Sequence, residues 1–321
     1  MKVLVTGGTG FIGGALLARL VADECCSVVA GGRRISPALP TEVRQWEVGE
    51  LNGDTDWREA LAAVDAVVHL AARVHVMDET ASDPGEAFRR VNVSGTLHLA
   101  RQAAAAGVKN FVFLSSIKVN GESTQPGQPY QADDPVAPQD AYGSSKSEAE
   151  SGLRGIAASS GMGFVIIRPA LVYGPGVKGN FLRLLKAIDR GVPFPLGAVR
   201  NRRSFCALDN LVDVMVTCLR HPGARNQTFL AADGGSVSTA ELLHLLGRAL
   251  GRPARVFTVP PVMLGLASRI LGKGDWMQRL TQSLEVDITK AREVLAWIPP
   301  VTFDEGLRRM AVDYRSTGGK T

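Results

Sequence analysis

Short apolar runs alternate with stretches of helical periodicity through the first half of the chain. The runs are rich in β-branched residues and predict strands at Lys2–Thr6, Ser27–Ala30, Arg44–Val48, Ala66–Leu70, Phe111–Leu114 and Phe164–Ile167. The stretches between them predict helices at Phe11–Ala22, Trp57–Ala63, Phe88–Ala106 and Ala141–Ser159. Regular strand–helix alternation is typical of an α/β fold, in which a doubly wound parallel sheet carries helices on both faces.

The texture of the sequence changes after about Tyr173, where glycine and proline become frequent. Beyond this point the pattern predicts short strands at Gln227–Leu230 and Arg255–Val259, and helices at Phe181–Asp189, Asn210–Arg220, Thr239–Leu250 and Thr289–Leu295. No clean linker separates the two regions. We therefore expect a sheet domain over residues 1–172 and a smaller mixed α/β substrate-binding region over 173–321. The second region should pack on the carboxyl ends of the strands and can exchange segments with the first.

A glycine-rich turn joins the first predicted strand to the first predicted helix. Gly7, Gly10 and Gly13 are spaced three apart, and Phe11 and Ile12 open the helix. Glycines allow a tight turn and a close approach of backbone to pyrophosphate, and a helix N-terminus supplies N–H donors. In this context the spacing indicates the dinucleotide site of a Rossmann-type fold. The alternative is a glycine-rich turn that binds no ligand.

Tyr142 and Lys146 are four residues apart near the start of a long predicted helix, so they share one helical face. An ammonium near a phenol favours the phenolate and lowers the pKa of the tyrosine, which can then exchange a proton with a hydroxyl or carbonyl. Ser115 and Ser116 end the preceding strand, where parallel sheets place their ligands. Together these residues predict a redox site; the alternative is a solvated helical face.

Composition and charge narrow the classes of function. The 321 residues are 45% hydrophobic and 21% charged, as in a folded globular protein. The net charge of +5 allows nucleic-acid binding, but the basic residues are scattered and no aromatic residues interleave with them, so we expect no nucleic-acid partner. An anionic small substrate suits the charge equally well. Four cysteines and five histidines form no metal-like cluster, so we expect no metal.

No targeting or membrane-spanning segment is expected. The N-terminal residues lack the apolar region and cleavage site of a signal peptide, so we expect the protein to stay in the cytoplasm. No apolar run reaches 18 residues. The best candidate, Val256–Leu271, contains two prolines and an arginine and is interpreted as core, with docking to a membrane surface as the alternative.

At these residues the chain resembles the extended short-chain dehydrogenase/reductase family, in its nucleotide-sugar branch of epimerases, dehydratases and ketoreductases. The resemblance covers nearly the whole chain. Its marks are the segments Thr6–Gly13, His69–Ala72, Asn92–Thr96, Leu114–Ser116, Tyr142–Lys146, Arg168–Pro169 and Tyr173–Gly176.

The resemblance implies a role for each matching residue. Tyr142 is the acid/base, Lys146 holds the nicotinamide ribose, and Ser116 is the catalytic serine with Ser115 beside it. It also implies a UDP-sugar substrate, held by Asn180 and Arg203, and a homodimer formed through the two long helices. The other cofactor contacts would come from Gly7, Gly10, Phe11, Ile12, Gly13, Glu50, Leu51, Leu70, Ala71, Ala72, Asn92, Ser115, Tyr142, Lys146 and Pro169.

The choice between NAD(H) and NADP(H) turns on the end of the second predicted strand. An NAD site of this fold has an acidic residue there, which accepts hydrogen bonds from the ribose. Gly32 occupies this position, and Arg33 and Arg34 follow it. Two guanidinium groups could bind a 2′-phosphate, so we expect NADP(H) to bind at least as well as NAD(H). The alternative is that both arginines stack on adenine or face solvent.

Two departures from the family pattern limit what it implies about the sugar. Asn120 stands where many epimerases have tyrosine, and Lys118 where a small polar residue is usual. The Asp-Glu pair of the dehydratases is replaced by Ile117-Lys118, which disfavours 4,6-dehydration. We expect a UDP-4-keto-6-deoxy-N-acetylhexosamine 4-reductase of bacterial surface-polysaccharide (O-antigen, lipopolysaccharide) synthesis. The alternatives are a UDP-glucose or UDP-N-acetylglucosamine 4-epimerase and, more remotely, a non-catalytic dinucleotide-binding regulator.

Overall fold

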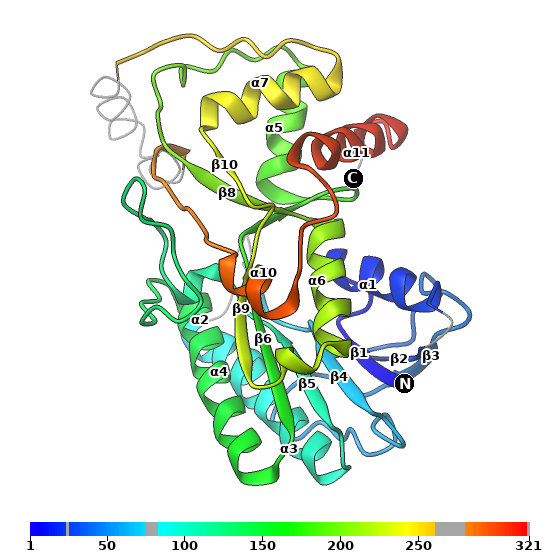
Figure 1. Ribbon diagram of the computed structural model, residues 1–321. Helices are drawn as coiled ribbons and strands as arrows, with labels where there is room; N and C mark the ends of the chain where they lie inside the picture. Colours follow the sequence, from blue (N-terminus) through cyan, green and yellow to red (C-terminus); the bar gives the residue numbers. More distant parts are fainter. Residues whose placement is uncertain (24–25, 75–82, 261–279, 320–321) are drawn as a thin grey trace.

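The computed structural model describes residues 1–23, 26–74, 83–260 and 280–319 (Figure 1). Within them, seven strands form one sheet in the order β3-β2-β1-β4-β5-β6-β9, and every neighbouring pair is parallel. The strands are β1 (Lys2–Thr6), β2 (Ser27–Gly32), β3 (Arg44–Glu47), β4 (Ala66–His69), β5 (Asn110–Leu114), β6 (Gly163–Pro169) and β9 (Gln227–Ala231). This topology confirms the predicted α/β fold with a Rossmann-type sheet.

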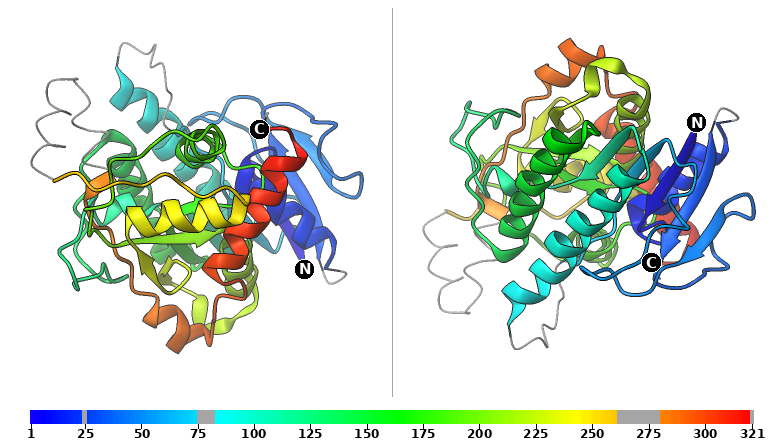
Figure 2. Two further views of the ribbon diagram at one scale, coloured as in Figure 1. Left: turned by 90° about the horizontal axis from the view of Figure 1, so that it is seen from above. Right: turned by 90° about the horizontal axis from the view of Figure 1, so that it is seen from below.

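Helices cover both faces of this sheet, as the buried, nearly uninterrupted apolar strands require. On one face lie α1 (Phe11–Val21), α6 (Leu208–Arg220) and α10 (Thr289–Leu295), which pack in one hydrophobic cluster with β1 and β9. On the other lie α3 (Thr96–Ala105) and α4 (Ala141–Ser160), side by side in the view from below (Figure 2). The sheet therefore holds its strand ends rigidly between two layers.

A smaller unit continues from the carboxyl end of β6. It has a three-stranded mixed sheet of β7 (Leu171–Tyr173), β8 (Arg203–Ala207) and β10 (Ser236–Val237), with parallel β7–β8 and antiparallel β8–β10 pairs. Helices α5 (Gly179–Asp189), α7 (Thr239–Leu250) and α11 (Phe303–Ser316) share its hydrophobic cluster and lie above the large sheet in Figure 1. The smaller mixed region is thus confirmed, while β9 lies in the large sheet although it follows residue 172.

Two predicted elements are wrong. Trp57–Ala63 forms successive turns and not a helix, because the segment is too short to propagate one and the Trp57 backbone N–H donates to the Gln102 side-chain oxygen. Arg255–Val259 forms only an isolated bridge, between Phe194 and Val256. The facing segment has proline at positions 193 and 195, and prolines cannot donate to a ladder.

The predicted helix over Phe88–Ala106 is longer and less regular than expected. It starts as α2 (Pro84–Phe88), which Asp83 caps, and passes through a π-helical stretch, Arg89–Gly95, before α3. Helix α11 has no counterpart among the predicted elements, although Thr302 caps it as a helix signal would require.

Some expectations lie partly outside the described residues. Residues 261–271 of the apolar Val256–Leu271 segment and the cysteine at position 25 belong to the undescribed part. Across the part of the chain that the structure describes, no helix is long and apolar enough to cross a membrane.

Candidate active site

The turn between β1 and α1 is packed so closely that only glycine fits it. Gly7 has φ of +73°, a left-handed conformation, and a Cβ there would lie 2.8 Å from the backbone nitrogen of Ala71. A Cβ on Gly13 would lie 2.1 Å from the carbonyl oxygen of Gly7. The Gly10 N–H donates to the Gly7 carbonyl oxygen, and Gly10 is the N-cap residue of α1. The predicted cradle is therefore present: an exposed helix N-terminus reached by bare backbone, which suits a pyrophosphate.

A chain of buried hydroxyl and imidazole groups ties the end of β4 to this cradle. The Thr6 hydroxyl accepts from the backbone N–H groups of Leu70 and Ala71, both at 3.2 Å. His69 contacts Thr6 through Nδ1 at 2.7 Å and Thr96 through Nε2 at 2.9 Å. The segment 70–72 is half-buried at the carboxyl edge of the sheet, where its predicted place in the cofactor cleft would put it.

Tyr142 and Lys146 lie in the first turns of α4. Asp140 starts the helix by accepting from the backbone N–H of Gly143 at 2.6 Å. Lys146 is buried; its Nζ donates to the carbonyl oxygen of Leu114 at 2.8 Å and lies 4.5 Å from the centre of the Phe113 ring. The helical spacing thus holds the lysine at the carboxyl end of β5.

The predicted serines lie at that same end of β5. Ser115 is buried and Ser116 is half-buried, with its hydroxyl accepting from the N–H of Lys118 at 3.3 Å. A Cβ on Gly143 would lie 2.8 Å from the carbonyl oxygen of Lys118, so the turn that carries Tyr142 packs directly on the turn after Ser116. The structure therefore brings the strand end and the Tyr142 turn together.

The electrostatics of the pair differ from expectation. The pKa of Tyr142 is raised, not lowered, because burial and the Asp140 carboxylate both disfavour the phenolate. Burial lowers the pKa of Lys146 to about 7, while Glu150 opposes this shift. The expected ammonium effect fails because Lys146 is directed to the Leu114 carbonyl and the Phe113 ring. Tyr142 consequently needs a further positive charge near it to become a base.

Asn92 lies in the π-helical stretch and is fully buried. Its side-chain oxygen accepts from the N–H of Arg73 at 2.8 Å, and its amide nitrogen donates at 3.0 Å both to the Arg73 carbonyl and to the Ser145 hydroxyl. Asn92 therefore joins the segment after β4 to the residue beside Lys146, which agrees with the ordering role that the resemblance implies.

The residues predicted to lie beside the adenine and its ribose are mostly at the surface. Arg33 and Arg34 are exposed just after Gly32, and the Arg33 guanidinium is 4.0 Å from the carboxylate of Glu50. Leu51 is half-buried; a Cβ on Gly95 would touch it. Both arginine side chains face solvent, where a ligand could reach their charges.

The remaining predicted contacts are spread over both sheets. Phe11 packs between the clusters of the two units, Ile12 packs against the cluster of the large sheet, and Pro169 is buried at the end of β6. Asn180 is exposed in the first turn of α5. Arg203 begins β8 and donates to the Gln282 carbonyl at 3.1 Å.

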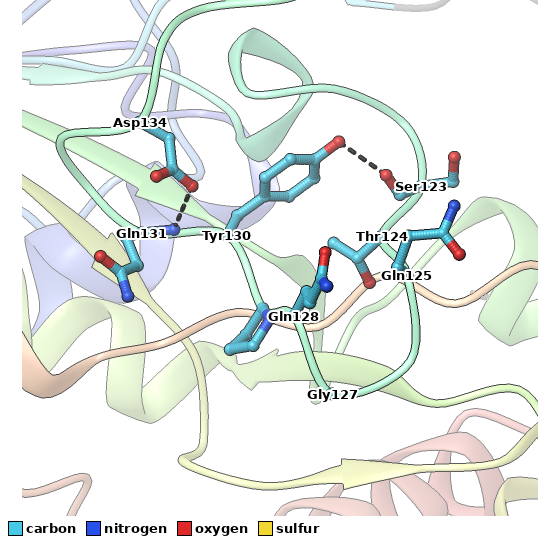
Figure 3. A pocket seen from close by; sticks show the side chains of 9 residues that line it. Ser123, Thr124, Gln125, Gly127, Gln128, Tyr130, Gln131 and Asp134 are labelled. Carbon is cyan, nitrogen blue, oxygen red and sulfur yellow. Dashed lines mark hydrogen bonds between the residues drawn. The ribbon is translucent and has the colours of Figure 1, made fainter.

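A polar concavity lies on the loop that follows Ser116 (Figure 3). It is lined by residues 123–125, 127–131 and 134, and the Tyr130 hydroxyl inside it donates to the Ser123 carbonyl at 2.7 Å. One loop forms the whole lining, so we do not assign it to the redox chemistry. Within the described ranges, histidine, cysteine, aspartate and glutamate side chains form no group of three that could hold a metal ion.

Two residues of the site have no predicted role, although Arg168 is one of the marks of the family resemblance. Glu150 and Arg168 form a buried ion pair directly behind the serines. Both left a signal in the sequence: Glu150 follows Lys146 by four residues on one helical face, and Arg168 ends an apolar strand in which a lone charge needs a partner.

Known proteins match the chain along nearly all of its length. The profile described as "NAD dependent epimerase/dehydratase family" matches residues 3–232. A "UDP-glucose 4-epimerase" of Vibrio cholerae is 45% identical over 97% of this chain and 94% of its own length. An "N-acetyl-alpha-D-glucosaminyl-diphospho-ditrans,octacis-undecaprenol 4-epimerase" of Escherichia coli O157:H7 is 29% identical over 96% of this chain and 93% of its own.

A solved structure shares the fold. The UDP-glucuronic acid 4-epimerase from Bacillus cereus, in complex with UDP-glucuronic acid and NAD, superposes with a TM-score of 0.80. It is 22% identical, and the match covers 99% of this chain and all of that one (100%).

Proposed function

The chain belongs to the NAD dependent epimerase/dehydratase family, and from this premise we propose that it interconverts UDP-glucose and UDP-galactose by inverting C4 of the sugar. The membership confirms the resemblance to the extended short-chain dehydrogenase/reductases and to their nucleotide-sugar branch, and it makes the chain an NAD-dependent enzyme. The 45% identity to the Vibrio cholerae UDP-glucose 4-epimerase carries the choice of reaction.

The site residues suit a bound dinucleotide. The cradle of Gly7 and Gly13 has no room for a Cβ, and the end of β4 lies against it, so backbone N–H groups can meet a pyrophosphate directly. When bound there, NAD would supply the acceptor and donor for the hydride at C4 of the sugar. We assign the hold on the nicotinamide ribose to Lys146, whose buried ammonium lies beside the strand end.

In our proposal Tyr142 moves the proton. Its phenolic oxygen accepts the proton of the C4 hydroxyl as the hydride leaves. It returns that proton to the C4 oxygen after the sugar has presented its other face. Ser116 orients the same C4 oxygen by a hydrogen bond. Because burial raises the pKa of Tyr142, the phenolate would need a positive charge beyond that of Lys146, which an oxidised nicotinamide would supply when bound. Asn180 and Arg203 are the proposed partners of the UDP phosphates.

The 4-reductase that the sequence favoured becomes the second candidate. It is supported by the exposed Arg33 and Arg34 at the end of β2, where no carboxylate repels a 2′-phosphate. A reductase takes up fresh reduced cofactor in each turnover, whereas an epimerase recycles its own. The relatives named above are epimerases, so we place the 4-epimerase before the 4-reductase.

A substrate panel separates the candidates. UDP-glucose, UDP-N-acetylglucosamine and a UDP-4-keto-6-deoxy-N-acetylhexosamine are incubated with the protein, with and without NADH or NADPH, and the products are identified by NMR. We expect UDP-galactose from UDP-glucose with no net cofactor consumption. Reduction of the 4-keto sugar with stoichiometric loss of NADPH, and no epimerisation, would favour the reductase. A homodimer, a cytoplasmic location and a role in surface-polysaccharide synthesis stay predictions.

A further inference from the structure

Glu150 is a buried carboxylate one helical turn beyond Lys146 in α4. Its partner is Arg168 at the end of β6: Arg168 Nε lies 2.9 Å from Oε1 of the glutamate, and Nη2 lies 2.6 Å from Oε2. Both residues are 3% exposed. Such a two-bond fork in the interior fixes geometry strongly, and removing either partner would leave a buried charge uncompensated.

The pair also holds the catalytic strand end. The Ser115 hydroxyl donates to Oε1 of Glu150 at 2.5 Å, which fixes the residue next to Ser116. On its other side, Arg168 donates through Nη1 to the Asn120 side-chain oxygen at 3.0 Å. Asn120 in turn donates to the Gln131 carbonyl at 3.1 Å, so the loop of Figure 3 is anchored to the same guanidinium.

The carboxylate has an electrostatic consequence for Lys146. The lysine donates to the Leu114 carbonyl and lies against the Phe113 ring, both on β5. Burial lowers its pKa, and Glu150 opposes that shift. The titratable and charged groups around it are His69 from β4, Tyr142, Glu150 and the half-exposed Arg154 from α4, and Arg168 from β6. His69 is held neutral by burial.

We propose that Glu150 and Arg168 form a positioning pair for the catalytic residues, in which the fork fixes Ser115 and the Ser116 loop and places the Glu150 carboxylate one helical turn from Lys146. The inference deepens the proposed function and rests on it for the roles of Ser116 and Lys146. Neither residue touches the substrate in this account. Each acts through the serines, the loop or the lysine.

The account predicts opposite effects for the two partners. Glu150→Gln removes the anion that opposes the effect of burial on Lys146 and leaves the Arg168 cation unpaired, so the ammonium becomes easier to deprotonate. Arg168→Gln removes the cation and leaves the carboxylate, so the ammonium becomes harder to deprotonate. A purely structural pair would give two variants with the same loss of stability and no opposite titration shifts.

Titration of Lys146 by NMR tests this without any turnover. The protein is labelled with 13Cε-lysine, and the Lys146 signal is identified by its absence in Lys146→Met. We expect its titration midpoint to fall by about one pH unit or more in Glu150→Gln, a tenfold change in proton affinity, and to rise in Arg168→Gln. Glu148→Gln is the matched control, because that carboxylate is on the same helix but exposed and paired with Arg89; it should leave the midpoint unchanged.

Shifts of the same sign in both variants, or shifts no larger than that of Glu148→Gln, would overturn the proposal. If either single variant fails to fold, the double variant Glu150→Gln/Arg168→Met, which carries no unpaired buried charge, takes its place. Because Glu150 acts on Lys146 more strongly than Arg168 does, the two opposite shifts should cancel only in part and leave a lowered midpoint. An unchanged midpoint would count against the pair. Turnover of UDP-glucose is measured separately: without it in the wild type the proposed function fails, while the titration still decides the electrostatic claim.

Discussion

The ammonium of Lys118 is paired with the carboxylate of Asp140, the residue that caps α4 two positions before Tyr142. Lys118 also binds Glu122, at 2.9 Å. Asp140 is one of the two causes that raise the pKa of Tyr142. A lysine that looked like a departure from the family pattern therefore partly offsets the charge of an anion that opposes the catalytic phenolate.

Replacing Lys118 should move the pH dependence of turnover. In Lys118→Met the free Asp140 carboxylate raises the pKa of Tyr142 further, so the rise of turnover with pH shifts to higher pH. Because the pair is about a quarter exposed, we expect a loss of roughly 2- to 5-fold at neutral pH. The measurement is a pH–kcat profile. Lys109→Met, which breaks an exposed ion pair with Asp65, is the control, and an equal effect there would refute the explanation.

Arg203 should matter to substrate far more than to cofactor. If its guanidinium binds the UDP diphosphate, Arg203→Ala loses one charge-assisted contact, which costs about 1.5–3 kcal/mol of substrate binding. Calorimetric titration with UDP measures this, with NAD as the second ligand. Arg202→Ala is the control, because that neighbour contacts Glu241, Glu285 and Ser236. Equal UDP affinity in wild type and Arg203→Ala would remove the role.

The exposed position of Arg33 and Arg34 predicts that both cofactors bind. Arg33 is 77% exposed and its ion pair with Glu50, at 4.0 Å, is exposed and therefore weak, so its guanidinium can turn towards a 2′-phosphate. We expect NADP(H) to bind the apo protein at least as well as NAD(H), and Arg33→Gln to weaken NADP(H) selectively. Fluorescence titration with NADH and NADPH compares the two. A clear NAD(H) preference in the wild type, unchanged in the variant, would show that the arginines take no part.

His69 predicts a pH-dependent stability. Burial lowers its folded pKa to about 3, below the ordinary value of 6.5, so between these limits the unfolded chain binds more protons than the folded one. The contribution of neutral His69 to stability is fully present above pH 6.5 and is lost as the pH falls. The free energy of unfolding should decrease by about 2 kcal/mol between pH 7 and 5. His69→Asn should remove most of this slope in urea unfolding, whereas the exposed His244→Asn should keep it. Identical slopes in all three proteins would contradict the assignment.

The sequence predictions that the structure matches depend on residues that are close together in the chain. The spacing of Gly7, Gly10 and Gly13 requires a tight turn, and the four-residue step from Tyr142 to Lys146 requires one helical face, so both could be placed from the chain alone. The parallel sheet followed in the same way from alternating strands and helices.

The features that escaped prediction depend on partners distant in sequence. Glu150 and Arg168 meet only because α4 lies against the end of β6. The direction of the Tyr142 pKa shift depends on where the Lys146 ammonium points, and a carbonyl of β5 decides this. Trp57–Ala63 has helical residues but is held by Gln102 of α3, a tertiary contact that overrides local preference.

The central claim is that one hydride leaves C4 of a UDP-hexose and returns to the same carbon while Tyr142 handles the proton. The most direct measurement is NMR of the products formed from UDP-galactose carrying deuterium at C4. The account predicts UDP-glucose that keeps the deuterium at C4, with turnover in Tyr142→Phe lower by a factor of roughly 100 to 10,000 and cofactor binding intact. Absence of UDP-glucose, loss of the label to solvent, or near-normal turnover in Tyr142→Phe would contradict it.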